Sequence, residues 1–259
     1  MAAEVKDGQV GDISEKVSEN RGLLYGDGLF ETLRVCAGRP LFVDRHLDRF
    51  RGSAQILGLD EELVRRACAA MERPEIDGDG LFRVTAIRGG EGVFGGGEGG
   101  VFTRSRPLPP QRPYRLTVVA GTYFPGDGLA ELKTTSWLRS VMARRTAEER
   151  GFDEAVMCTT CGRVGEASAA NVFARIQGRW VTPVVRGILP GVVRGVVLNR
   201  ASALGLRVEE AVMTVAELLA AEAVAITSTG RLVSAVVAVD EVTFDAAPVG
   251  ELRRLVEEA

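Results

Sequence analysis

The sequence predicts an α+β protein of two domains, and two observations support this prediction. Strand-like and helix-like segments follow one another along most of the 259 residues, which is enough chain for two buried cores. This pattern stops once, in the proline-rich segment at residues 107–114, and then restarts. We therefore expect a small domain at residues 1–107, a linker at 108–113 and a larger domain at 114–259.

The first domain is expected to contain two helices among its strands. Asp44 can cap a helix that Gly58 ends, and an apolar stripe of that helix faces the core. His46 and Arg49 share a different face of the same helix. The other expected elements are two strands within residues 23–42 around a turn at Ala37–Gly38, a helix at 61–71, and strands at 81–89 and 101–108.

The second domain is expected to hold many short strands separated by turns. Pro190 lies at the first turn of a helix that Gly205 ends, and Thr214 with Glu217 has the spacing of a capping box. The strands are expected at residues 115–121, 153–158, 162–168, 171–176, 179–183, 222–227 and 232–239, and further helices at 137–150 and 251–258.

Composition excludes several classes of function. The net charge of −3 and the charged fraction of 26% do not predict binding to nucleic acid or to anionic membranes. No apolar run is long enough to span a bilayer, and the polar N-terminal stretch lacks the apolar core of a signal peptide. We therefore expect a cytoplasmic protein.

Two glycine- or cysteine-containing motifs are expected to be structural. Cys158 and Cys161 form CTTC, but a zinc site needs four ligands, and the other two cysteines and the single histidine, His46, are isolated in the sequence. We expect a hairpin turn there and no metal. The glycine-rich segment 89–100 lacks the GK[ST] of a phosphate-binding loop, so we expect a mobile surface or active-site loop.

Lysine usage singles out one residue. Only three of the 32 basic residues are lysines, and Lys133 is the only lysine outside the polar N-terminal stretch. Arginine cannot form a Schiff base, because its guanidinium stays protonated and delocalised. A lone lysine in an arginine-rich chain is therefore a candidate for covalent amine chemistry, although the chance survival of one surface lysine is the simpler explanation.

Four further motifs are weak one by one. Pro190 and Gly191 open a helix whose first backbone N–H groups could bind a phosphate, and Arg49 could clamp one. Glu166 is a carboxylate among small and apolar residues, and Thr229 follows a predicted strand. Each also has an ordinary structural explanation, such as a helix start, a salt bridge, a surface glutamate or a strand end.

Together these motifs resemble the class IV (fold type IV) pyridoxal-phosphate enzymes. The resemblance covers about residues 22 to 240, with the motifs in the order and spacing of the family. It implies a two-domain fold like that of D-amino-acid aminotransferase, with the cofactor cleft at the domain boundary, and a homodimer. The segments that carry it are LLYGDGLFETLRVCAGRPLFVDRHLDRF, LKTTSWLRSVMARRTAEERGFDEAV, GRVGEASAANVF and ILPGVVR.

The resemblance also implies a role for each matching residue. Lys133 carries pyridoxal 5'-phosphate and later moves the proton, and Glu166 pairs with the pyridine nitrogen and keeps it protonated. Tyr25 and Phe30 contact the substrate, with Tyr25 facing the cleft of its own or of the neighbouring subunit. The phosphate is held by Arg49, the backbone N–H groups of Val192 and Val193, and Thr229.

Within the family, LLYGDGLFETLR most resembles the 4-amino-4-deoxychorismate lyase group. Phe30–Thr32 reads FET where branched-chain aminotransferases typically carry FEG, while Ser136 and Trp137 depart from the pattern of the lyase group. The resemblance implies a lyase that releases pyruvate and leaves 4-aminobenzoate for folate synthesis. The alternatives are an aminotransferase acting on a branched-chain or D-amino acid or an amine, with a 2-oxo acid acceptor, and a non-catalytic paralogue.

Overall fold

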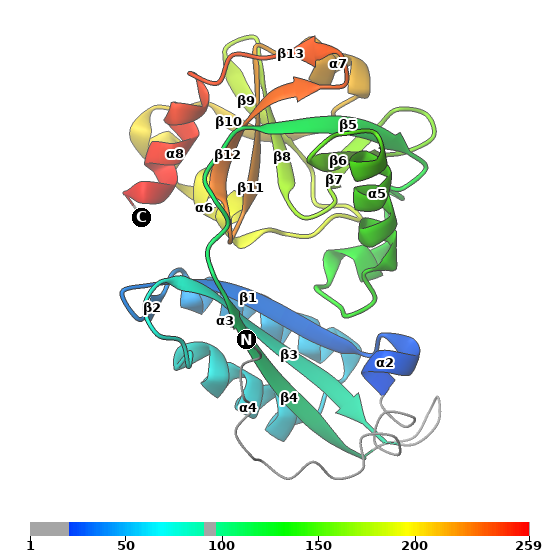
Figure 1. Ribbon diagram of the computed structural model, residues 1–259, viewed down its shortest axis with the longest axis vertical. Helices are drawn as coiled ribbons and strands as arrows, with labels where there is room; N and C mark the ends of the chain where they lie inside the picture. Colours follow the sequence, from blue (N-terminus) through cyan, green and yellow to red (C-terminus); the bar gives the residue numbers. More distant parts are fainter. Residues whose placement is uncertain (1–20, 91–96, 259) are drawn as a thin grey trace, which may run out of the picture.

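The protein folds around two β-sheets that follow one another along the chain (Figure 1). The computed structural model describes residues 21–90 and 97–258. Predictions for the polar N-terminal stretch and for most of the glycine-rich segment lie outside the described residues. The first sheet ends at Arg106, and the first strand of the second sheet begins at Tyr114, so the proline-rich segment connects the two sheets. The division into domains at 108–113 stays a prediction.

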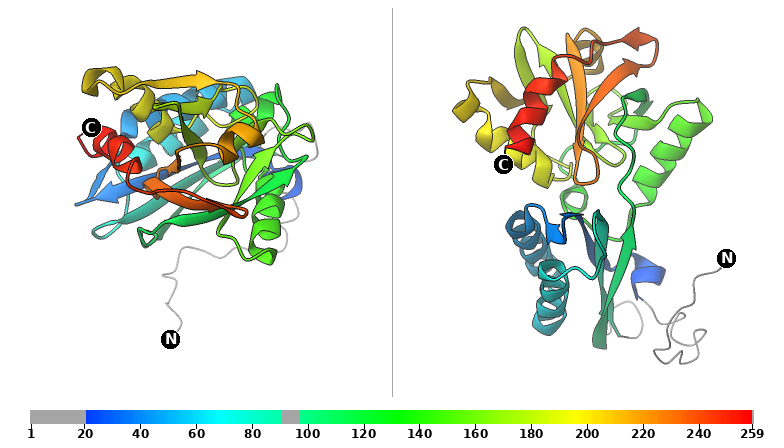
Figure 2. Two further views of the ribbon diagram at one scale, coloured as in Figure 1. Left: turned by 90° about the horizontal axis from the view of Figure 1, so that it is seen from above. Right: turned by 60° about the vertical axis from the view of Figure 1, so that its left-hand side comes forward.

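The first sheet is antiparallel and has the strand order β2-β1-β3-β4. Helices α3 and α4 cover one of its faces (Figure 2), and Leu33, Phe50 and Phe82 lie in the core between them. In register, Thr32 lies opposite Arg83, and these side chains lie on the face away from the helices. The elements are β1 Gly28–Cys36, β2 Arg39–Pro40, α3 Val43–Leu57, α4 Glu61–Glu72, β3 Gly80–Gly89 and β4 Gly97–Arg106.

The second sheet is mixed, with the order β10-β9-β8-β11-β12-β5-β6-β7 and β13 paired to β12. Helices α6 and α8 pack on one face, with Trp180 and Phe173 buried beneath them, and α5 packs on β5 and β6. Its elements are β5 Tyr114–Ala120, η1 Gly128–Glu131, α5 Leu138–Glu149, β6 Glu154–Cys158, β7 Val164–Ala167, β8 Asn171–Ile176, β9 Arg179–Pro183, α6 Val192–Arg200, η2 Ser202–Leu204, β10 Val208–Ala211, α7 Val215–Leu219, β11 Ala223–Ser228, β12 Leu232–Val239, β13 Val242–Thr243 and α8 Val249–Glu257.

Two predictions near the N-terminus of the first sheet are wrong. The first predicted strand is present as β1 but begins only at Gly28, because the residues before it form a short helix, α2 (Arg21–Tyr25), followed by Gly26 at φ 67°. The turn at Ala37–Gly38 and the second strand are confirmed. The side chain of Asp44 does not cap α3, because the helix already begins at Val43 and Asp44 lies in its first turn.

In the second sheet, the helix predicted from Pro190 to Gly205 is shorter. Pro190 precedes the N-cap Gly191, α6 ends at Arg200, and Gly205 instead closes the separate turn η2. Strand β10 and helix η1 were not expected from the sequence. The capping box of Thr214 and Glu217 is confirmed, as is the hairpin turn at CTTC between β6 and β7.

The helices are short compared with a bilayer. In the described part of the chain, no helix combines the length and the apolar character needed to cross a membrane.

Candidate active site

The backbone around Lys133 is held by the first strand of the other sheet. Phe30 donates its N–H to the Lys133 carbonyl at 2.9 Å, and Thr135 donates to the Gly28 carbonyl at 2.9 Å. Strand β1 pairs with β3 along its other edge, so the lysine segment extends this ladder by an isolated bridge. Lys133 is thereby placed between the two sheets.

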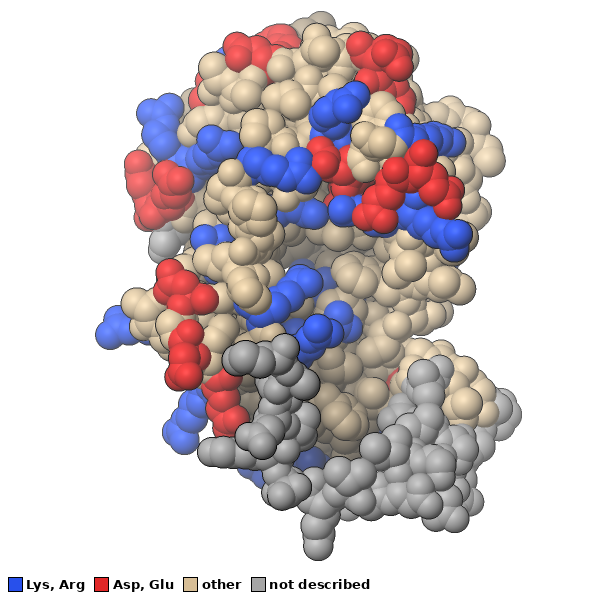
Figure 3. All heavy atoms as spheres, viewed as in Figure 1, with Lys and Arg blue, Asp and Glu red and all other residues tan. Residues whose placement is uncertain are grey.

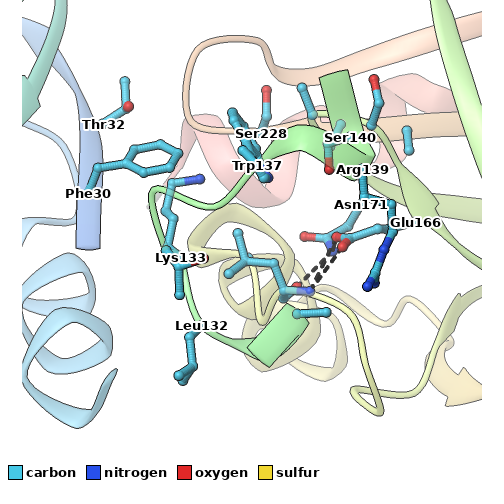
Figure 4. Close-up of a pocket in the computed structure, with 18 of the residues that line it drawn as sticks. Phe30, Thr32, Leu132, Lys133, Trp137, Arg139, Ser140, Glu166, Asn171 and Ser228 are labelled. Carbon is cyan, nitrogen blue, oxygen red and sulfur yellow. Dashed lines mark hydrogen bonds between the residues drawn. The ribbon is translucent and has the colours of Figure 1, made fainter. Parts of the chain in front are cut away.

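The amine of Lys133 lies in an aromatic corner of the cleft (Figure 4). Its Nζ is 4.5 Å from the ring centre of Phe30 and 4.9 Å from that of Trp137. The two rings meet edge to face at 5.1 Å. Desolvation, together with the nearby charge of Arg49, lowers the pKa of Lys133 to about 8, so a useful fraction of the amine is uncharged near neutral pH.

Glu166 lines the same cleft from β7. Its carboxylate accepts from the Leu189 N–H at 3.2 Å and from the Asn171 amide at 3.2 Å. Burial raises the pKa of Glu166 to about 8, because these neutral donors and the more distant cations do not compensate for the lost water. A carboxylate in this state would gain from a positively charged partner in the cleft.

A third part of the cleft is built to receive an anion. Helix α6 begins there without a side-chain cap on Gly191, so its first N–H groups, those of Val192 and Val193, face the cleft. Arg49 reaches this point from α3 and donates to the Pro190 carbonyl at 3.0 Å. Gly191 is required here, because an added Cβ would collide with Asn171 Oδ1. Thr229 also lines the cleft.

The cleft has a volume of ≈ 1100 Å³ and is lined by residues of both sheets. Lys and Arg side chains gather around the hollow between the two parts of the molecule (Figure 3). Phe30 is buried in its wall, whereas Tyr25 is 47% exposed and lies on its lining near α2. Arg83 stacks on Phe30 with 3.6 Å between its guanidinium carbon and the ring centre.

Comparison with known proteins gives this arrangement a family. Residues 28–239, most of the chain, match the amino-transferase class IV family. The chain belongs to the class IV aminotransferase family. It is 30% identical to a candidate branched-chain-amino-acid aminotransferase of Methanocaldococcus jannaschii, over 92% of this chain and 88% of that protein. It is 29% identical to a D-alanine aminotransferase of Bacillus licheniformis, over 93% of this chain and 89% of that protein.

Solved structures confirm the predicted fold of this class IV aminotransferase. The branched-chain aminotransferase of Thermoproteus uzoniensis superposes with a TM-score of 0.81 at 26% identity, covering 92% of this chain and 86% of that one. A candidate 4-amino-4-deoxychorismate lyase of Legionella pneumophila shares the fold, with a TM-score of 0.85 at 24% identity, covering 98% of this chain and 96% of that one. The α+β fold of a type IV enzyme is therefore confirmed.

The family depends on pyridoxal phosphate, and the donors in this cleft fit that cofactor. The cleft offers an amine, a carboxylate, a guanidinium and an uncapped helix N-terminus, which match an aldehyde, a ring nitrogen and a phosphate. Thr227, a further residue of the cleft wall, is 1% exposed, and its buried hydroxyl has no hydrogen-bond partner among the described residues.

The structure brings all the sequence-predicted site residues of this class IV enzyme to one cleft. It adds Arg83 and Asn171 to the cleft lining and Glu31 behind Arg49, three residues that the sequence did not predict. Glu31 was missed although it lies in the FET motif, Asn171 although it follows Glu166 closely, and Arg83 because a single arginine in a strand carries no pattern. The sequence could have indicated Glu31 and Asn171, since each is a polar residue at a strand position that is otherwise apolar.

Proposed function

We propose that Lys133 carries pyridoxal 5'-phosphate in this cleft and that the other residues hold its ring and phosphate. Glu166 would pair with the pyridine nitrogen. The protonated ring would supply the positive charge that the buried carboxylate lacks and would lower the raised pKa of Glu166. The phosphate would lie between Arg49, the N–H groups of Val192 and Val193, and Thr229. The proposal is supported by the presence of all these groups in the lining of one cleft.

When bound, the cofactor supplies an electron sink for a bond broken at the substrate carbon that bears the amine. Lys133 would take the proton from that carbon, because its amine is partly uncharged near neutral pH. Phe30 and Trp137 flank the amine and limit the access of water to it. Among the described residues, the only histidine, His46, is fully buried beside Glu31, which leaves lysine as the acid–base group.

We further propose that the substrate is a cyclic dianion, and the observation that carries this proposal is a row of arginines without carboxylate partners. Arg83, Arg104 and Arg106 lie on the cleft-facing side of β3 and β4, with Arg83 directly opposite Arg104. No ion pair to a carboxylate is found for these three in residues 21–90 and 97–258. Their mutual repulsion and the burial of Arg83 lower the pKa of Arg83, a cost that bound anions would remove.

4-Amino-4-deoxychorismate has this chemistry, because it is a ring with two carboxylates. Its carboxylates would meet the arginines, and its ring would lie near Phe30 and Trp137. Lys133 removes the proton at the amine-bearing carbon, and that electron pair forms the last ring double bond. The adjacent C–O bond breaks, and the leaving enolpyruvate takes up a proton and becomes pyruvate. The products are 4-aminobenzoate, a precursor of folate, and pyruvate.

Transamination is the second candidate, and the relatives favour it. The two curated relatives named above are described as aminotransferases of branched-chain amino acids and of D-alanine. In that case the arginines would hold the carboxylates of a dicarboxylic 2-oxo acid acceptor instead.

One pair of assays tests both proposals. The purified protein with pyridoxal phosphate should be yellow, and borohydride should fix the cofactor on Lys133, as shown by peptide mass. Incubation with aminodeoxychorismate and no acceptor should release 4-aminobenzoate and pyruvate in equal amounts. Turnover that requires a 2-oxo acid would contradict the lyase and support the aminotransferase, while a protein that takes up no cofactor would contradict both.

We propose a homodimer, since apolar side chains gather on the exposed surface around the start of α5. Leu138, Val141 and Met142 of α5 are each at least half exposed, and Leu129 in η1 is 64% exposed. A second copy would cover such a face. Sedimentation should give a dimer, which a charged Val141→Glu would shift toward monomer. The cytoplasmic location stays a prediction.

A further inference from the structure

Glu31 is a buried carboxylate that touches neither Lys133 nor open solvent. It lies on β1, faces α3, and is 1% exposed. Arg49 donates to both of its oxygens, Nε to Oε1 at 2.8 Å and Nη2 to Oε2 at 2.7 Å. This two-point contact uses two of the five N–H donors of the arginine, and a third, on Nη1, goes to the Pro190 carbonyl. One N–H on each of Nη1 and Nη2 is left for other partners.

His46 is the second buried partner of this carboxylate. It is fully buried on α3, and its Nδ1 lies 2.8 Å from Glu31 Oε2. Its other ring nitrogen lies 3.5 Å from Thr229 Oγ1, in the turn between β11 and β12. A chain of contacts therefore runs from Arg49 through Glu31 and His46 to Thr229, across both sheets.

The protonation states of Glu31 and His46 follow from their burial and from the neighbouring charged groups. Burial alone would raise the pKa of Glu31, but the charge of Arg49 and the hydrogen bond of His46 hold it well below its usual range. Burial lowers the pKa of His46. The ionised Glu31 thus balances the charge of Arg49, and a neutral imidazole bridges to Thr229.

We propose that Glu31 and His46 are positioning residues that hold Arg49 and Thr229 for the phosphate of the cofactor. This inference rests on the proposed function. A long arginine side chain loses considerable rotamer freedom when it binds a ligand. Fixing Arg49 before the phosphate arrives removes much of that loss. The network should therefore raise the affinity for the phosphate and leave the affinity for the ring unchanged.

Positioning by Glu31 and the charge of Glu31 predict opposite effects on phosphate binding, so the two explanations can be separated by experiment. Glu31 is an anion next to the guanidinium of Arg49. If only charge mattered, Glu31→Gln would strengthen the binding of a phosphate. If positioning matters, the amide weakens it, because its NH₂ group faces the N–H donors of Arg49 or His46 and disturbs their geometry.

The experiment compares two ligands in the full-length protein. Dissociation constants are measured for pyridoxal 5'-phosphate and for pyridoxal, which lacks the phosphate, by absorbance titration of protein freed of cofactor. For Glu31→Gln we expect about a 10-fold loss of affinity for pyridoxal phosphate and less than a 2-fold change for pyridoxal. Glu241→Gln, at an exposed glutamate, is the control for the loss of one charge and should change neither.

His46→Gln is the milder second variant, because it replaces one neutral side chain by another that can also donate and accept. We expect a loss of about 3-fold for pyridoxal phosphate alone, and a larger loss for His46→Phe, which fills the space without polar atoms. An unchanged ratio of the two constants in both Glu31→Gln and His46→Gln, or tighter binding of pyridoxal phosphate, would overturn the inference. Failure of the wild-type protein to bind pyridoxal phosphate would instead contradict the proposed function.

Discussion

Glu166→Gln should make the cofactor-free protein more stable while it removes the proposed partner of the ring nitrogen. The pKa of Glu166 is raised from 4.5 to about 8 in the folded chain. In the unfolded chain the carboxyl group loses its proton near pH 4.5, whereas the folded chain keeps it until about pH 8. The free energy of unfolding therefore falls as the pH rises from 4.5 to 8, and is unaffected by this group below that range.

The size of the effect follows from the same pKa values. Each pKa unit corresponds to about 1.4 kcal/mol, so the penalty at pH 8 has an upper limit of about 5 kcal/mol. Because Glu166 as a residue is only half-buried in the cleft, the penalty should be well below this limit, and we expect roughly 2 kcal/mol. For a chain of this size, this corresponds to a rise in Tm of about 4–8 °C.

Thermal unfolding of the cofactor-free protein between pH 5 and pH 8 measures this effect. The stability difference between Glu166→Gln and wild type should be small at pH 5 and grow toward pH 8. Glu241→Gln, at an exposed position, serves as the control. Added pyridoxal phosphate should reverse the order, because the wild-type carboxylate gains a charged partner and the amide does not. A difference that stays constant with pH would refute the reasoning.

Three other perturbations have defined outcomes. The rate of cofactor capture should level off near pH 8, the pKa of Lys133, since at pH 7 this gives about 300 times more free amine than the ordinary value of 10.5; a rise continuing to pH 10 would contradict it. Gly191→Ala should lose about 1–3 kcal/mol in thermal unfolding because its Cβ meets Asn171, whereas Gly52→Ala, in open space on α3, should be neutral or stabilising. Arg83→Met should lower kcat/KM for a dianionic substrate about 10- to 100-fold in steady-state kinetics, and a monoanionic substrate should be affected less.

Much of the fold could be predicted from the sequence, because the information was local. Alternating and helical apolar patterns identified most strands and helices of both sheets. The start of the first predicted strand was misplaced because the apolar residues before Gly26 suit either a strand or a short helix. Strand β10 was missed because VEEA has little apolar character and forms only by parallel pairing with β9, a contact distant in sequence.

The candidate site also contains residues that the sequence predicted and residues that it did not. Lys133, Glu166 and Arg49 were predicted because each belongs to a motif, and all three line one cleft. The partners that set their properties were not predicted. Glu31 meets Arg49 only because this side chain of β1 faces α3, and Asn171 meets Leu189 across a separation of 18 residues. Such contacts depend on register and on packing between sheets, which a sequence pattern does not encode.

The bridge between Lys133 and the start of β1 links cofactor chemistry to folding. The reactive amine is in place only when the two sheets have docked, because its backbone is bonded to Phe30 of the other sheet. Binding of the proposed cofactor on this lysine is thus expected to stabilise the docked arrangement of the two sheets against separation. The yellow colour of the protein would then report correct assembly of the whole chain, and heating or denaturant should bleach it in step with unfolding of both halves.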